Sequence, residues 1–111
     1  MDKLIHETAD HLLAIEQEMR RIGLWETTPP AKEALESLVP FCYDTLKFEQ
    51  WLQWVFLPKM KLALEQQIDF PTSSNIATLA EMCFQEMTNT DASRLLELLK
   101  LFDETINAAS R

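Results

Sequence analysis

The segment from Pro40 to Met60, PFCYDTLKFEQWLQWVFLPKM, constrains the fold of this chain more than any other. Its 21 residues contain two of the three tryptophans, three of the six phenylalanines and two of the five prolines. Between residues 48 and 57, apolar side chains recur at helical spacing and cover most of the girth of one helix. Such a helix needs neighbours on several sides, so we expect this segment at the centre of the fold.

Two residues are expected to define the ends of this helix. Asp44 can cap its start, because a carboxylate at that position accepts hydrogen bonds from the first backbone amides. Tyr43 and Phe48 flank the cap with the spacing of a hydrophobic staple. Pro58 lacks a backbone N–H and disrupts a helix interior by about 3 kcal/mol. We therefore predict a helix that begins at Asp44 and is kinked or broken at Pro58, followed by a second segment to about residue 67.

Apolar residues at spacings of three and four predict three further long helices, over residues 2–22, 75–87 and 92–108. Gly23 stands where a left-handed C-cap would end the first of them. A short helix is expected over residues 29–37, with Leu35 and Leu38 facing inward. These elements predict a single domain over residues 1–111. Its fold class is all-α, a four-helix bundle with a proline-kinked or broken central helix and one short extra helix.

Composition narrows the function classes. The apolar fraction of 47% is typical of a globular domain, whereas the net charge of −8 repels phosphate backbones and makes direct nucleic-acid binding unlikely. A single glycine disfavours the glycine-rich loops of Rossmann and P-loop proteins. The N-terminus lacks the pattern of a signal peptide, and no apolar run is long enough for a membrane span. We therefore expect a cytoplasmic protein without membrane contact.

No residue pattern predicts a metal, a cofactor or a catalytic centre. Cys42 and Cys83 form no CxxC pair and lie far in sequence from both histidines, so they read as small buried side chains in a reducing compartment. Asp44 beside aromatic residues has two interpretations, a general base in a pocket or the helix cap described above, and the cap explains its position without further function.

Six residues are candidates for an interaction surface or a pocket. They are Tyr43, Asp44, Trp51, Trp54, Pro58 and Lys59. Trp54 lies off the main apolar stripe and would mark a contact patch if it were exposed. Aromatic residues at helical spacing usually belong to the core, and a lysine at the start of a helix is usually solvated. For these candidates, a purely structural role without binding therefore remains an open alternative.

The same central segment resembles the signature of the YqcC-like family of small bacterial proteins. The matching residues are Pro40, Phe41, Asp44, Thr45, Trp51, Leu52, Gln53, Trp54, Val55, Pro58, Lys59 and Met60. The resemblance implies a small four-helix bundle without an established activity, and some members carry a label that connects them to tRNA pseudouridine synthase C. Such synthases resemble a much larger α/β domain, so the resemblance does not imply catalysis by Asp44.

Three functions therefore remain open. The first is a protein-interaction module that binds another protein or a second copy of itself as a homodimer, through a patch around Trp54, Pro58 and Lys59. The second is a small-molecule-binding protein with a cavity between helices, lined by Trp51, Trp54 and Tyr43. The third is an accessory factor in tRNA modification. It would require a strip of basic residues on the surface, which the composition does not indicate.

Overall fold

The computed structural model describes residues 2–67 and 71–109, and within these ranges every regular element is helical. The elements are α1 (Asp2–Arg21), α2 (Lys32–Leu35), η1 (Pro40–Cys42), α3 (Phe48–Trp51), η2 (Leu52–Phe56), α4 (Leu57–Gln66), α5 (Ile76–Gln85) and α6 (Ser93–Ala109). Segments α3, η2 and α4 follow one another without a loop and form one central helix. The described part of the chain therefore forms the expected all-α bundle, with four long helices and the short α2.

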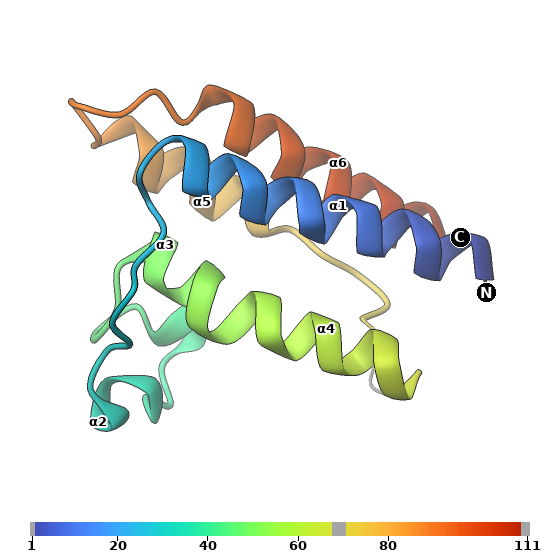
Figure 1. The fold of residues 1–111 in the computed structure, drawn as a ribbon, viewed down its shortest axis with the longest axis horizontal. Coiled ribbons are helices and arrows are strands. Elements are labelled where there is room, and N and C mark those ends of the chain that lie inside the picture. The colour runs from blue at the N-terminus through green and yellow to red at the C-terminus, as the bar shows by residue number, and fades with distance from the viewer. Residues whose placement is uncertain (1, 68–70, 110–111) are drawn as a thin grey trace.

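The helices pack around one hydrophobic core, with α1, α5 and α6 on one side and the central helix on the other (Figure 1). Helices α1 and α6 lie side by side and antiparallel, α5 lies against α6, and α4 runs below α1 (Figure 1). The apolar stripe of α1 faces inward, with Leu12, Ile15 and Met19 almost fully buried. Leu95, Leu99 and Phe102 of α6 meet this stripe in the hydrophobic cluster. The amphipathic patterns of the first and last helices are thus confirmed as core faces.

Helix α1 ends at the glycine that the sequence indicated. Gly23 has φ of 80°, its N–H bonds the carbonyl of Arg20 at 3.3 Å, and the N–H of Leu24 bonds the carbonyl of Met19 at 2.9 Å. This pair of bonds is the Schellman arrangement that satisfies the last carbonyls of a helix. Leu24 and Trp25, which follow the glycine, pack against the core.

The central helix changes its hydrogen-bonding pattern just before Pro58. Residues Leu52–Phe56 form a π-helical turn in which the N–H of Leu57 bonds the carbonyl of Leu52, and α4 then restarts with Pro58 in its first turn. Pro58 has no N–H to donate, so the regular ladder of helical bonds cannot pass through it unchanged, and the wider π turn directly before it is where the bonding pattern shifts. The predicted disruption is therefore confirmed as a restart within a continuous helix.

The start of the central helix was predicted wrongly. It begins at Phe48 after an N-cap at Lys47, whose backbone N–H bonds Oε1 of Gln50 at 2.8 Å. Asp44 does not cap it; its Oδ1 accepts a 2.5 Å bond from the hydroxyl of Ser37 in an exposed turn. Because residues 42–46 already form that turn, Tyr43 points to solvent and makes no staple with Phe48.

The segment before it is also shorter than predicted. Helix α2 covers Lys32–Leu35 only, and Ala31 at its N-cap contributes no side-chain bond. Leu35 is half-buried, whereas Leu38, expected to face inward, is fully exposed. A four-residue helix makes few internal hydrogen bonds, so its tertiary contacts decide where it ends.

Helix α5 is capped from another helix. Asp103 of α6, only 8% exposed, accepts bonds from the backbone N–H groups of Ile76 and Ala77 at 3.2 and 2.9 Å, and from the hydroxyl of Ser74 at 2.5 Å. The negative carboxylate also complements the positive end of the helix dipole. This buried contact fixes where α5 starts against α6.

Candidate functional site

The six residues singled out in the sequence do not form one site. Trp51 and Lys59 line a cavity between the central helix and residues 71–76, whereas Trp54 and Pro58 line a hollow beside residues 25–27. Tyr43 lines a third depression, against α5. Asp44 lines none of these three depressions and stays in its exposed turn.

The cavity has a volume of about 530 Å³ and a mostly apolar wall. Phe41, Trp51, Phe56 and Phe102 supply aromatic rings, and the ring of Phe41 meets that of Trp51 edge to face with centroids 4.8 Å apart. Lys59, which is exposed, is the only charged residue among its described lining residues. An enclosure of this kind can accommodate an apolar group, but no described carboxylate faces it to act as a general base.

The depression against α5 is an apolar groove of about 600 Å³. We call it the α5 groove; its described lining residues are Val39, Pro40, Phe41, Tyr43, Asn75, Thr78, Leu79 and Met82, none of which is charged. It shares Pro40, Phe41 and Asn75 with the cavity, so the two hollows adjoin. Sequence reasoning missed this groove, because Met82 lies outside the apolar stripe of α5 and Leu38 was assigned to the core.

Large apolar side chains are exposed around the α5 groove. Tyr43 and Met82 are 67% and 62% exposed, Val39 is 42% exposed, and Leu38 next to it is fully exposed. The chain has only three other large apolar residues of comparable exposure among those described, Leu13, Leu62 and Leu101, and they lie on α1, α4 and α6. Single exposed apolar residues are normal, whereas a cluster of them around a concave surface forms a patch of the kind found at binding sites for proteins or ligands.

A strained turn builds one wall of the α5 groove. Phe41 and Cys42 have φ of 60° and 50°, the left-handed region that costs a non-glycine residue about 1–2 kcal/mol. The turn is held by bonds from the N–H groups of Cys42 and Leu46 to the carbonyls of Val39 and Cys42, and by a 2.7 Å bond from the hydroxyl of Thr45 to the carbonyl of Ala34. This conformation directs Phe41 toward the cavity while Tyr43 stays outside.

Trp54 is half-buried by a polar clamp. Its indole Nε1 donates to Oε1 of Glu26 at 3.1 Å, so the indole is not the exposed contact patch that the sequence allowed. The buried amide of Gln53 bonds both the N–H and the carbonyl of Glu26, at 2.8 and 2.7 Å. Arg20 stacks over Trp25 at 4.5 Å from the ring centroid. The bonds from Gln53 and Trp54 attach Glu26 to the central helix and give Trp54 a structural role, whereas the Arg20 contact holds Trp25 against α1.

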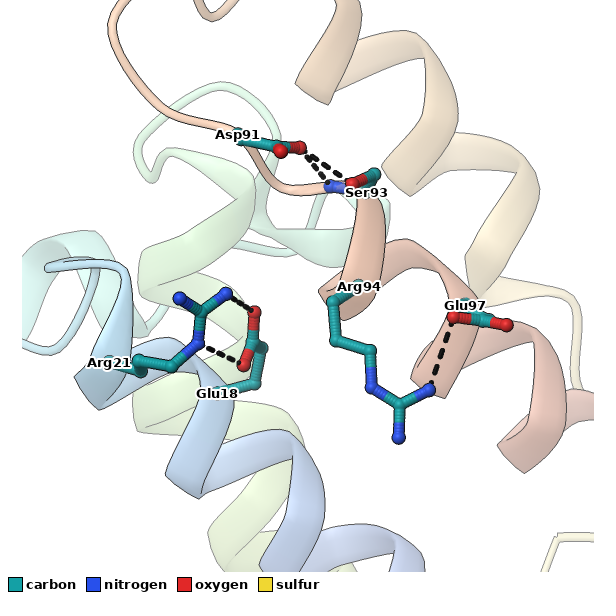
Figure 2. Close-up of polar contacts among 6 residues, drawn as sticks. All are labelled: Glu18, Arg21, Asp91, Ser93, Arg94 and Glu97. Carbon is teal, nitrogen blue, oxygen red and sulfur yellow. Dashed lines mark hydrogen bonds and ion pairs between the residues drawn. The ribbon is translucent and has the colours of Figure 1, made fainter.

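The shifted pKa values described next have local structural causes: hydrogen bonds, burial and neighbouring charges. Two hydrogen bonds from Arg21 hold the pKa of Glu18 below its ordinary value, and hydrogen bonds from the hydroxyl and N–H of Ser93 lower the pKa of Asp91 (Figure 2). Burial raises the pKa of the Cys83 thiol, as do the charges of Glu86 and Glu49. Within residues 2–67 and 71–109, no three His, Cys, Asp or Glu side chains gather as a metal site.

Taken together, the fold and its surface define a small all-helical protein whose main distinctive feature is an apolar groove. Residues 7–105 match the family model DUF446, described as tRNA pseudouridine synthase C, and the chain belongs to this family. The uncharacterised protein YqcC of Escherichia coli is 32% identical over 90 residues, which cover 81% of this chain and 83% of that protein. The YqcC-like resemblance is thereby confirmed.

Two other relatives differ from each other in how much of their length this chain matches. An uncharacterised protein of Haemophilus influenzae is 36% identical over 102 residues, 92% of this chain and 94% of that protein. A protein of Pectobacterium carotovorum named tRNA pseudouridine synthase C is 41% identical over 68 residues, which are 61% of this chain but only 18% of that protein. No solved structure matches the chain. Because two of these three relatives are named as uncharacterised, family membership assigns no activity.

The described helices do not include a membrane span, because none combines sufficient length with sufficient apolar character.

Proposed function

We propose that this chain is a protein-interaction module that binds its partner through the α5 groove. The observation that carries the proposal is the concentration of exposed Val39, Tyr43 and Met82 on an uncharged concave surface, with fully exposed Leu38 next to Val39 in the sequence. Aromatic and methionine side chains are enriched in protein interfaces, where their burial supplies much of the binding energy. The unpaired Cys42 and Cys83 support a cytoplasmic location, where thiols stay reduced.

Site-directed photo-crosslinking in the living cell tests this function. A photoreactive amino acid at position 82 is expected to yield a discrete protein adduct, because Met82 lies at the groove and is 62% exposed. The matched control is position 13. Leu13 lies on α1 and is 56% exposed, much like Met82, but it lines neither the cavity nor the α5 groove. Tyr43→Ser in the chain labelled at position 82 should reduce the adduct. Absence of an adduct at position 82, or equal adducts at both positions, refutes the proposal.

A second candidate is an accessory factor for a tRNA pseudouridine synthase. It is supported by the family description and by the 68 matched residues that form 18% of a longer protein named tRNA pseudouridine synthase C. The acidic charge of −8 favours a contact with protein over a contact with tRNA. Mass spectrometry of the adduct from position 82 tests it: a synthase C peptide is the expected partner, and any other protein rejects this candidate.

A further inference from the structure

The two sequence stretches that line the α5 groove are acidic, whereas a basic residue, Lys59, lines the adjoining cavity. Residues 62–93 contain five acidic residues and no lysine, arginine or histidine, and residues 33–46 contain three acidic residues and likewise none of the three. These two stretches provide every described residue that lines the groove. The basic residues of the chain therefore come from other parts of the sequence.

Three acidic residues lie close in the sequence to residues that line the groove, although none of the three lines it and Glu81 lines a separate hollow with Asp91. Glu81 precedes Met82 in α5, and Glu86 follows Met82 by four residues, which is one turn further along the same face. Asp44 follows Tyr43 on the opposite wall. All three carboxylates are exposed, and none makes an ion pair within residues 2–67 and 71–109.

Four described carboxylates outside the stretches that line the groove, Glu7, Glu16, Glu18 and Glu97, have cationic partners. Glu16 pairs with Arg20 and Lys61, and Glu18 pairs with Arg21 at the end of α1. On α6, Arg94 pairs with Glu97 (Figure 2). Asp44, Glu81 and Glu86 differ from these residues because they form no ion pair with a described residue, although Glu36 of the 33–46 stretch pairs with Lys32. An incoming basic group would meet those three carboxylates unpaired.

The size of the floor limits the occupant. Helix α5 has 10 residues, which at 1.5 Å per residue is about 15 Å of length. A partner helix of about three turns lying along it would place an apolar side chain over the floor every three or four residues. A second copy of this chain is disfavoured, because its own acidic rim and net charge of −8 would face the same acidic rim.

We propose that the α5 groove receives an amphipathic helix of a partner protein, with apolar side chains along one face and lysine or arginine beside them. The inference rests on the proposed interaction function and specifies the chemistry of the partner. Apolar contacts with Val39, Leu79 and Met82 hold the helix, and the acidic rim selects its charge.

Two synthetic peptides test this partner chemistry against the full chain. Both are 14-residue amphipathic helices with the same leucine face; one carries lysine on its polar face and the other glutamate. Backbone amide chemical shifts of the full chain should move at residues 38–43 and 75–86 with the lysine peptide only. The affinity should fall as salt rises, because exposed charges are screened.

Charge-reversal variants separate the groove from the net charge. Glu81→Lys with Glu86→Lys should weaken lysine-peptide binding about fivefold or more at low salt, as expected for two rim charges, and should admit the glutamate peptide. Asp10→Lys with Glu104→Lys is the matched control: it changes the net charge equally at exposed acidic residues of α1 and α6, so less than a twofold loss is expected. An equal loss in both pairs, or equal binding of the two peptides to the unaltered chain, overturns the inference.

Two further outcomes have defined meanings. If sedimentation shows a dimer of the chain that Met82→Lys dissociates, a second copy occupies the groove and the inference is overturned. If the adduct from position 82 forms but is unchanged by Glu81→Lys with Glu86→Lys, the interaction function stands and the basic-helix inference fails. If no adduct forms at position 82 of the otherwise unaltered chain, the proposed interaction function is refuted, whatever the result of the peptide experiments.

Discussion

Removing the buried carboxylate of Asp103 should destabilise the bundle strongly, because this side chain caps α5 from α6. Asp103→Ala leaves the buried N–H groups of Ile76 and Ala77, and the hydroxyl of Ser74, without their acceptor. Loss of a helix cap costs about 0.5–2 kcal/mol, and a hydrogen bond to a charged group contributes about 1.5–3 kcal/mol. Since water reaches these buried amides poorly, we expect a loss of about 3 kcal/mol in the free energy of unfolding, or about 13 °C in melting temperature.

Urea unfolding followed by far-ultraviolet circular dichroism measures this loss. The matched control is Asp91→Ala, because Asp91 is exposed and accepts from the N–H and hydroxyl of Ser93 at the start of α6, at 3.0 and 2.6 Å. That ordinary cap should contribute about 1 kcal/mol. Asp103→Asn, which retains one carbonyl acceptor but no charge, should fall between the two. If Asp103→Ala costs no more than Asp91→Ala, the burial argument is refuted.

Three other changes have expected outcomes from the same structure. Gly23→Ala should cost about 1 kcal/mol in urea unfolding, from backbone strain at φ of 80° alone, because no atom lies within 4 Å of the added carbon. Gln53→Ala should cost about 1–3 kcal/mol and increase the solvent exposure of residues 25–27 in hydrogen exchange, because it removes both bonds to the backbone of Glu26; unchanged exchange there would contradict the clamp. The folded-state pKa of Glu18 lies below its unfolded value because of Arg21, so the pair stabilises the fold above the ordinary glutamate pKa of 4.5, and this contribution is lost as the pH falls through the lowered value. Glu18→Gln should therefore flatten the acid side of the stability-against-pH curve, and an unchanged slope would show that the pair is not linked to folding.

Helices with a single buried stripe could be predicted from the sequence. The spacing of Leu12, Ile15 and Met19 requires one inward face, and Gly23 marks the end of α1 because left-handed backbone is strained for other residues. Pro58 likewise indicated the disruption of the central helix, because it lacks a donor. In each case a local chemical property decides the local structure.

Contacts between distant residues could not be predicted in this way. Asp103 looked like an ordinary polar residue of the last helix, yet it caps a helix that begins 27 residues earlier. Gln53 and Trp54 looked like parts of an apolar helix, yet they bond Glu26, which is 27 and 28 residues away. Asp44 had the chemistry of a cap but lies in a turn whose left-handed residues are not glycine. Local preference was overridden there by tertiary packing.

The turn at Phe41 and Cys42 connects this failure of prediction with the proposed function. A turn shaped by local preference alone would place glycine or asparagine at one of its two left-handed positions. Here both positions carry side chains that the core buries at least in part, and the Phe41 ring packs against Trp51. Burying a phenylalanine contributes about 1.5–3 kcal/mol, which offsets the strain and fixes the turn in one conformation. Val39 and Tyr43 are therefore presented from a rigid base, and a preformed surface loses less conformational entropy on binding than one that must be ordered by its partner. Burial of Phe41 thus accounts for the strain, and the rigid turn that results supports the proposal that the α5 groove is preformed for binding.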